Sequence, residues 1–106
     1  MIYDQSEIER LYLSSNQLTQ IPPALCGLIN LRVLKLENNK LTQVPPEIGK
    51  LTRLIALDLS DNILKSIPIE IERLTKLLTL DLSNNQFDRV PKWLDKMIEF
   101  IKNKNK

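Results

Sequence analysis

The amino-acid sequence predicts one short α/β solenoid, a right-handed arc with four parallel strands on its concave side. Irregular turns or short 3-10 or α segments are expected on the convex side, with a helical cap at the C-terminus. The first observation behind this prediction is a proline that returns every 23 residues, as Pro22, Pro45, Pro68 and Pro91. The second is an asparagine at the same interval, as Asn16, Asn39, Asn62 and Asn85. A fixed period of this size indicates stacked repeats.

Four copies of the pattern LxxLxLxxNxLxxIPxxIxxLxx follow one another without a gap, over residues 8–30, 31–53, 54–76 and 77–99. In each copy two apolar residues lie two positions apart, as Leu34 and Leu36 do, and this spacing sends both side chains to one face of a strand. The proline then fixes φ where the chain turns back, which suits a short 3-10 or helical turn. Residues 1–106 are therefore predicted to form one domain with one continuous core.

This pattern resembles the leucine-rich repeat family, in the 23-residue form with an Ile-Pro or Val-Pro step. That form is also found in small bacterial repeat proteins and in Ras-suppressor-type proteins. The likeness covers residues 8 to about 97. It implies a binding module whose concave strands contact a protein partner.

The four repeating asparagines are predicted to be structural. Each stands where a strand bends into the return segment and the backbone leaves its ladder. A carboxamide both donates and accepts, so stacked asparagines can bond the backbone groups of adjacent turns. None of the four opens an Asn-x-Ser/Thr sequence, which excludes attachment of an N-linked glycan to them.

The C-terminus is predicted to cover the last core layer with a helix over residues 91–102, followed by a basic tail over 102–106. Apolar residues recur there at helical spacings of three and four, as Trp93, Leu94, Met97, Ile98 and Ile101. Trp93 either folds over the core as part of this cap or anchors a partner. A second register aligns Phe100 with Leu77 and would start a fifth strand.

The N-terminus has no matching cap in the sequence. Ile2 aligns with the return-segment position of Leu25, and Gln5 stands where a leucine is expected. The first strand is therefore predicted to be an open edge, which Glu7, Glu9 and Arg10 discourage from pairing without preventing it. A homodimer through this uncapped edge is a possible consequence.

No residue set supports catalysis, and we expect no cofactor and no metal. Histidine is absent, and Gly27 and Gly49 are too few for a phosphate loop. Cys26 is expected in an exposed return segment, with a structural or incidental role. Asp58 and Asp81 lie one repeat apart, close enough to hold a cation, although without a pocket a solvated pair is favoured.

The charge distribution argues against nucleic acid as a partner. The formal charge is +2, but Lys102, Lys104 and Lys106 supply it from the terminal segment, where they form no stripe along a face. No membrane span is expected, because no apolar run approaches about 20 residues. One cysteine and no recognisable signal peptide favour a cytoplasmic location, although a secreted parent protein would look the same.

Outward-pointing strand residues form the surface that we call the concave face. Its N-terminal end is aromatic and basic, with Arg10, Tyr12, Arg32 and Lys35. Its other end is acidic and apolar, with Ile55, Asp58, Asp61, Leu78 and Asp81. The predicted function is an adaptor or scaffold that binds a protein here, with Tyr12 as an anchor. Alternatives are plain solvated surface, a structural or self-assembling repeat unit with no dedicated partner, or the recognition part of a longer multidomain protein.

Overall fold

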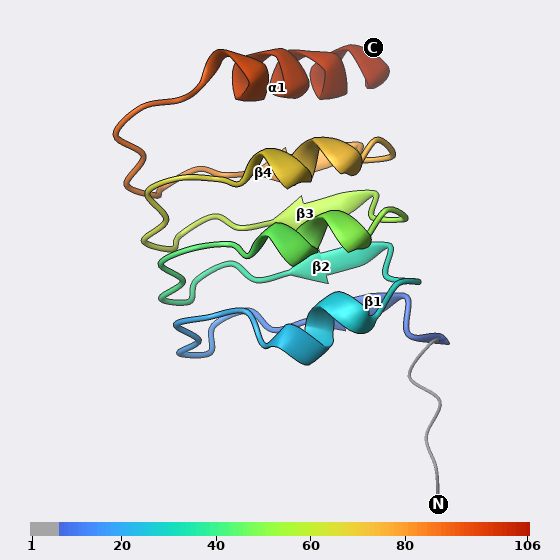
Figure 1. Cartoon of the computed structure of the whole chain (residues 1–106), viewed down its shortest axis with the longest axis vertical. Helices are drawn as coiled ribbons and strands as arrows, with labels where there is room; N and C mark the ends of the chain where they lie inside the picture. Colours follow the sequence, from blue (N-terminus) through green and yellow to red (C-terminus); the bar gives the residue numbers. More distant parts are fainter. Residues whose placement is uncertain (1–6) are drawn as a thin grey trace, which may run out of the picture.

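In the part of the chain that the structure describes, four three-residue strands run parallel along one side of the molecule (Figure 1). The computed structural model describes residues 7–106, so the alignments of Ile2 and Gln5 lie outside the described residues. The strands are β1 (Arg10–Tyr12), β2 (Val33–Lys35), β3 (Ala56–Asp58) and β4 (Thr79–Asp81), in that order. Each residue pairs with the one 23 positions later, as Leu11 does with Leu34. The predicted parallel sheet is confirmed.

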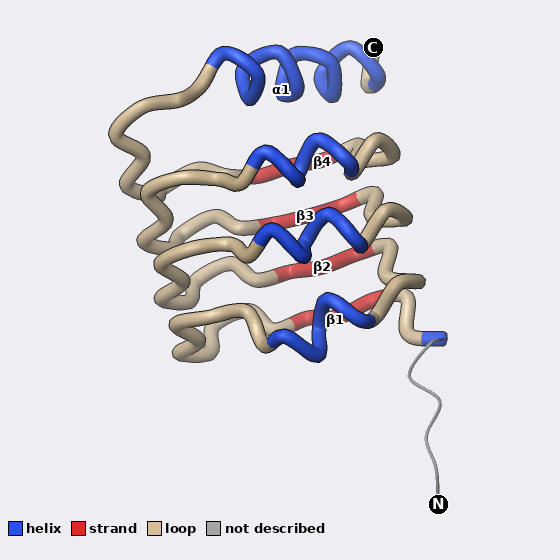
Figure 2. Tube along the Cα trace, in the orientation of Figure 1, coloured by secondary structure: helices blue, strands red, loops and turns tan. Residues whose placement is uncertain are grey.

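Three 3-10 segments form a second layer beside the strands (Figure 2). They are η2 (Pro23–Gly27), η3 (Pro46–Lys50) and η4 (Ile69–Arg73). Each follows a proline, and in η3 the amide of Ile48 donates to the carbonyl of Pro45 at 3.0 Å. The fixed φ of proline favours this tight turn, and five residues leave no room for a longer helix. The return segments are thus 3-10 turns, one of the forms that the sequence predicts.

The core lies between these two layers and runs unbroken along the stack. In the second and third repeats the inward leucines of the strands are fully buried. They meet buried return-segment side chains such as Ile48 and Ile71. The contribution is large, because burying one leucine or isoleucine stabilises the fold by about 1.5 to 3 kcal/mol relative to leaving it exposed.

Gly49 sits where η3 and η4 approach each other most closely. A Cβ at Gly49 would lie 2.9 Å from the backbone oxygen of Glu70, whereas a Cβ at Gly27 would meet nothing within 4 Å. We predict that Gly49→Ala lowers the free energy of unfolding by about 1 to 3 kcal/mol, because the two turns must separate. Gly27→Ala is the matched control, expected to be neutral or slightly stabilising. Urea unfolding of both variants measures this, and equal stabilities would contradict the prediction.

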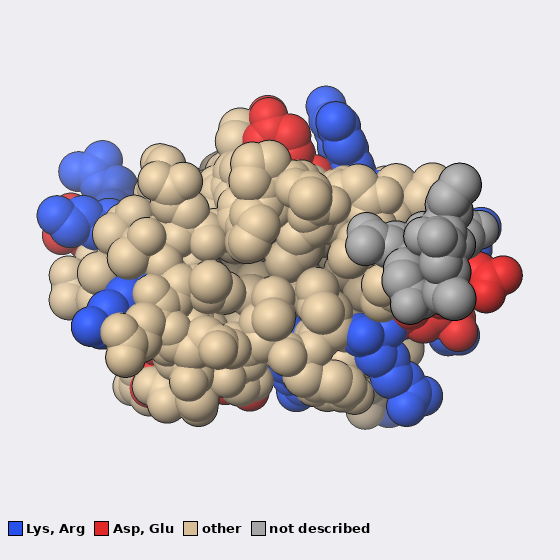
Figure 3. All heavy atoms as spheres, turned by 90° about the horizontal axis from the view of Figure 1, so that it is seen from below, with Lys and Arg blue, Asp and Glu red and all other residues tan. Residues whose placement is uncertain are grey.

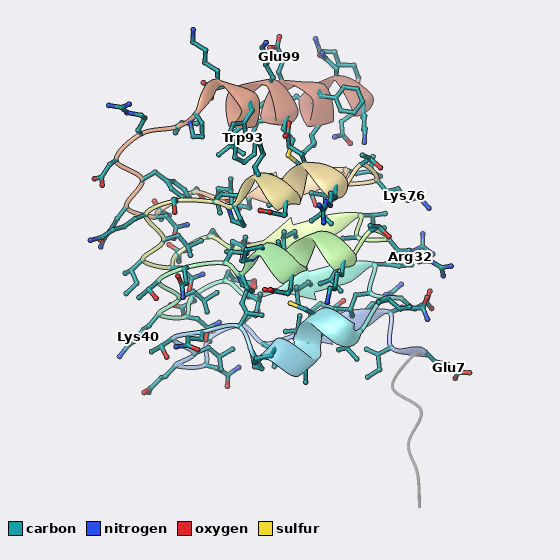
Figure 4. All side chains as sticks on the ribbon, viewed as in Figure 1. Glu7, Arg32, Lys40, Lys76, Trp93 and Glu99 are labelled. Atoms are coloured by element: carbon teal, nitrogen blue, oxygen red, sulfur yellow. The ribbon has the colours of Figure 1, made fainter. Side chains whose placement is uncertain are left out.

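The C-terminal helix α1 (Lys92–Lys104) lies across the last repeat and caps the core. Leu94 and Ile101 are buried, and Trp93 is partly buried against the core. In Figure 4, Trp93 points from α1 toward η4, whereas Glu99 points away from the stack. The helical cap is therefore confirmed. The alternative fifth strand is wrong, because Phe100 lies within this helix and is 60% exposed.

The predicted basic tail over 102–106 needs correction, because α1 runs two residues past 102 and its end is bonded to the segment where the third repeat passes into the fourth. Lys104 Nζ donates to the carbonyl of Thr75 at 2.6 Å and to that of Leu77 at 3.2 Å. Asn105 Nδ2 donates to the carbonyl of Leu78 at 2.8 Å. In the third repeat, the carbonyl of Ile55 occupies the position of the Leu78 carbonyl and accepts the backbone amides of Leu78 and Thr79 instead. At Leu78 the side chain of Asn105 thus replaces the donors that a fifth strand would supply.

Cys26 is also corrected, because its side chain is buried and not exposed. It is buried because η3 stacks against this side of η2, as η4 stacks against Gly49 of η3. The sequence aligns Cys26 with the charged Glu72 and Asp95, and Glu72 at the same position of η4 is exposed. Burial and the carboxylate of Glu47 raise the pKa of the Cys26 thiol. A buried thiol with a raised pKa is a poor nucleophile.

Candidate functional site

The repeating asparagines lie in the turn after each strand, where they bond adjacent repeats together. Asn62 Nδ2 donates to the carbonyls of Leu59 and Ser60 in its own repeat, both at 3.1 Å. It also donates to the carbonyl of Leu36 in the preceding repeat at 3.1 Å. Asn62 Oδ1 accepts from the amide of Leu41 at 3.0 Å. One side chain therefore bonds four backbone groups in two repeats.

Asn39 and Asn85 repeat this arrangement, and Asn16 does not. Asn39 bonds the first repeat through the carbonyl of Leu13 and the amide of Leu18. Asn16 is exposed, and its side chain donates to the carbonyls of Leu13 and Ser14 in its own repeat. These bonds make the asparagines part of the scaffold that holds the strands in place.

The strands point one set of side chains into the core and the other onto the concave face. Leu34 and Leu57 are buried, while the neighbouring Lys35 and Asp58 are only partly covered. Tyr12 on β1 is the most open of the large apolar residues, with 61% of its surface exposed. The structure places every predicted site residue in the strands or in the turns that flank them.

Three of the predicted charged site residues take part in ion pairs, two of them with each other and one with Glu9. Lys35 Nζ lies 4.0 Å from Asp58 Oδ2 across β2 and β3. Arg32 lies 4.0 Å from Glu9 across the turns that precede β2 and β1. Exposed pairs of this length stabilise a fold by about 1 kcal/mol at most. Their main effect is to mask the basic character predicted for the N-terminal end.

Asp81 lies at the acidic end and has no ion pair within 4.0 Å among the described residues. Ser83 Oγ donates to Asp81 Oδ1 at 2.6 Å, and the Ser83 amide donates to the same oxygen at 3.0 Å. These two hydrogen bonds hold the pKa of the Asp81 carboxyl below its usual range, with a smaller effect from Lys35. Asp58 is bonded to Ser60 in the same way.

The Asp81 bonds predict a pH dependence of stability. Because the folded pKa is lowered, the carboxylate stabilises the fold above the unfolded pKa, and this contribution disappears as pH falls through the folded pKa. Ser83→Ala should therefore reduce stability at neutral pH by under about 1 kcal/mol, since the site is exposed. At about pH 2 the variant and the parent should be closer in stability. Urea unfolding at both pH values measures the difference, and a gap that stays constant would contradict the assignment.

Asp61, predicted to bind a partner, has a backbone role that the sequence reasoning missed. Its φ is +55°, and the matching Ser15, Asn38 and Asn84 have φ values between +55° and +58°. Among residues other than glycine, asparagine and aspartate adopt this left-handed conformation most readily. The signal in the sequence was the short polar residue before each repeating asparagine. The turn therefore accounts for the residue type at Asp61 without a partner.

Shallow grooves hollow both ends of the concave face. A groove of about 160 Å³ lies among Glu9, Arg10, Arg32, Val33 and Ile55. A second groove, of about 240 Å³, lies between β4 and α1, where Leu78, Thr79 and Leu80 face Ile98 and Ile101. Leu78 is 42% exposed there. The two ends of the face thus offer different chemistry, charged at β1 and apolar at β4.

A third groove lies outside the concave face, between η4 and α1, and sequence reasoning missed it. It measures about 300 Å³ and is lined by residues that include Trp93, Met97 and Phe100. Lys104 Nζ sits 4.8 Å from the centre of the Phe100 ring, a cation–π contact. Trp93 thus both packs on the core and lines an open groove.

Residues 7–106 contain no group of three or more acidic, cysteine or histidine side chains arranged to hold a metal ion. No helix in the same part of the chain is long and apolar enough to cross a membrane.

Comparison with known proteins identifies the repeat. A family model described as "Leucine-rich repeat region" matches residues 10–101. No curated protein sequence matches the chain.

Among solved structures, a leucine-rich repeat protein of Leptospira interrogans is 37% identical with a TM-score of 0.77, over 92% of this chain and 24% of that one. The leucine-rich repeat ectodomain of the Arabidopsis thaliana receptor kinase SOBIR1 is 34% identical with a TM-score of 0.73, over 90% and 52%. The Arabidopsis thaliana BIR2 ectodomain is 30% identical with a TM-score of 0.68, over 81% and 58%. The chain thus spans between about a quarter and three fifths of these proteins.

Proposed function

The chain belongs to the leucine-rich repeat family, and from this premise we propose that it binds a protein partner through its concave face. Domains of this family are typically protein-interaction modules and are generally not enzymes. The observation that supports the proposal is the exposure of large apolar side chains at both ends of a rigid strand face, Tyr12 at one end and Leu78 at the other. Exposed aromatic residues on a rigid element are effective anchors.

The charges of the face define the partner that would fit. Lys35 and Asp58 neutralise each other at the centre, so their free charge is small. Asp81 stays open to a basic group at the β4 end, beside the apolar Leu78. The proposed partner therefore presents an apolar side chain next to a lysine or arginine for that end, and a surface that accepts Tyr12 at the other.

The test uses charge reversals on the two faces of the same protein. The concave variant exchanges the central pair, Lys35→Glu with Asp58→Lys, which keeps an ion pair but reverses its direction. The matched convex control is Lys50→Glu with Glu47→Lys, on exposed residues of η3. In affinity capture followed by mass spectrometry, the concave variant should lose partners that the convex control retains. Retention of every partner by the concave variant, by Tyr12→Ala and by Leu78→Ala would exclude this face.

A second candidate function is self-assembly, and the difference between the two ends of the stack favours it. At the C-terminal end, Asn105 bonds the carbonyl of Leu78, which a further strand would use, and Lys104 bonds the nearby carbonyls of Thr75 and Leu77. At the other end of the described chain, β1 is the edge of the sheet. A strand edge of this kind is a template for pairing with another chain.

Two further proposals concern context. The first is that the chain works as the recognition part of a larger protein, since it spans only 24%, 52% and 58% of its three solved relatives. Sequencing of the surrounding open reading frame tests this.

The second is the cytoplasmic location, supported by the single buried thiol of Cys26. Cell fractionation tests it, and recovery of the protein outside the cytoplasm would overturn it.

A further inference from the structure

The N-terminal end of the stack leaves its first core layer partly uncovered. Five apolar residues of that layer are only partly buried, although Ile21, Leu25 and Cys26 of its return segment are buried; the five are Ile8, Leu11, Leu13, Leu18 and Leu28. Their counterparts one repeat later are fully buried: Leu31, Leu34, Leu36, Leu41 and Leu51. Figure 3 views the molecule from this end, where uncharged side chains fill the middle and charged ones lie around the margin. The partly buried apolar residues given above, with charged side chains around them, form the kind of surface that serves as an interface.

The backbone of β1 is oriented to pair with a strand beyond it. In β2 the amide of Val33 donates back to the first repeat, and the carbonyl of Lys35 accepts from it. Arg10 and Tyr12 occupy the same repeat positions as Val33 and Lys35. By this register, the amide and carbonyl groups of Arg10 and Tyr12 point away from β2. They form a short pairing edge with Leu11 at its centre.

We propose that this edge pairs with β1 of a second copy, antiparallel, across a two-fold axis at Leu11. In this register Arg10 of each copy lies opposite Tyr12 of the other, and the two residues exchange both backbone hydrogen bonds. Two such pairs satisfy all the outward groups of the three-residue strand. The inference deepens the self-assembly candidate and rests on it.

The side chains complement this register. Arg10 and Tyr12 both point to the concave face and are both exposed. Across the axis each guanidinium would meet the phenol ring of the other copy, a favourable cation–π arrangement that occurs twice. On the opposite side Leu11 meets its own copy, and the two exposed core layers join. The strand is thus self-complementary, as a two-fold interface requires.

The size of the end face sets the strength of this dimer. The Cα atoms extend over 30 by 21 Å across the two shorter axes, so the projected backbone area of one end is about 630 Å². A standard interface buries about 800 Å² on each partner. We therefore expect a dissociation constant in the micromolar range or weaker.

Association should stop at two copies. Helix α1 covers the core at the C-terminal end, and Asn105 bonds the carbonyl of Leu78 at the β4 edge. A head-to-tail contact between β4 and β1 of another copy would have to displace this helix. A two-fold contact between identical open ends is closed and cannot propagate.

Sedimentation of the full-length protein over a range of concentrations tests whether the dimer exists. We expect a monomer–dimer equilibrium with no larger species. Tyr12→Ala should raise the dissociation constant roughly ten-fold, because two cation–π pairs are lost, while Tyr12→Phe should retain most of the affinity. A monomer at every concentration would overturn both self-assembly and this inference, and species beyond a dimer would overturn the closed geometry.

Disulfide trapping tests the register. The opposed residues of a hydrogen-bonded antiparallel pair lie about 5.5 Å apart at Cα, within disulfide range. Chains carrying Arg10→Cys mixed with chains carrying Tyr12→Cys should therefore cross-link under mild oxidation, and neither variant should do so alone. The matched control on the capped edge, Thr79→Cys mixed with Asp81→Cys, should stay uncross-linked, as should the parent with its buried Cys26.

The cross-linking results distinguish a wrong register at β1 from an absence of self-assembly. A dimer by sedimentation with no cross-link in the mixture, or with cross-links in each variant alone, would overturn the two-fold register while self-assembly stands. Cross-linking in the mixture alone supports the proposal. Docking of a different protein on the concave face is judged by the charge-reversal experiment, whose result does not depend on the register at β1.

Discussion

Replacing Asn62 by alanine is expected to lower the free energy of unfolding by about 4 kcal/mol. Asn62 is only 5% exposed, and its side chain bonds carbonyls in two repeats and the amide of Leu41. Removing it leaves several buried backbone groups without partners, at roughly 1 to 3 kcal/mol each. The total stability of a domain this size is about 5 to 15 kcal/mol, so the variant should be only marginally folded at 25 °C.

Urea unfolding monitored by circular dichroism measures this loss, with Asn16→Ala as the matched control. Asn16 is exposed and bonds only carbonyls of its own repeat, so its removal should cost under about 1 kcal/mol. Asn62→Asp distinguishes the contribution of the side-chain oxygen from that of the NH2 group, because aspartate keeps an acceptor for the Leu41 amide but has no donor for the carbonyls. Equal losses for the two alanine variants would show that the bonds between repeats contribute little.

The second large effect is expected at the cap, where Leu94→Ala should destabilise the protein by about 3 kcal/mol. Leu94 is 2% exposed and lies in the first turn of α1 over the last core layer. Truncating a buried leucine typically costs 2 to 5 kcal/mol, because it loses the transfer energy and leaves a cavity. The loss acts on the whole stack, since terminal repeats of a solenoid require a cap.

Phe100→Ala is the control for the cap, because Phe100 lies on the same helix but is largely exposed. Its loss removes one cation–π contact with Lys104 and should cost about 0.5 to 1 kcal/mol. Thermal and urea unfolding of both variants gives the comparison. If Phe100→Ala were as damaging as Leu94→Ala, the groove beside η4 would be part of the core.

The repeat pattern predicted the parallel sheet, the 3-10 turns and the capping helix, because a fixed period constrains every repeat at once. The end of α1 could not be predicted in this way. In the sequence, Lys104 and Asn105 look like part of a charged, polar tail. Their side chains instead donate hydrogen bonds to the carbonyls of Thr75 and Leu78, which are remote in sequence. A single copy of an interaction leaves no periodic signal.

The concave face was predictable as a surface but not as a charge pattern. Strand alternation placed Lys35 and Asp58 outward, yet their mutual contact depends on side-chain conformation. The positive φ of Asp61 and Asn84 depends on turn geometry, although short polar residues at that column were a visible signal. The prediction that Cys26 is exposed was wrong for a similar reason, because the aligned residues are charged while the next return segment, η3, covers Cys26.

The asparagine bonds also determine at which end of the stack local unfolding should begin. Asn39, Asn62 and Asn85 each bond their own turn to the preceding one, whereas Asn16, the first of the series, bonds only carbonyls of its own repeat among the described residues. Helix α1 closes the opposite end through Lys104. Local unfolding should therefore begin at the first repeat and travel toward the C-terminus, so that slow amide exchange marks the second and third repeats. A partner or second copy that covers β1 would then slow exchange through the whole stack.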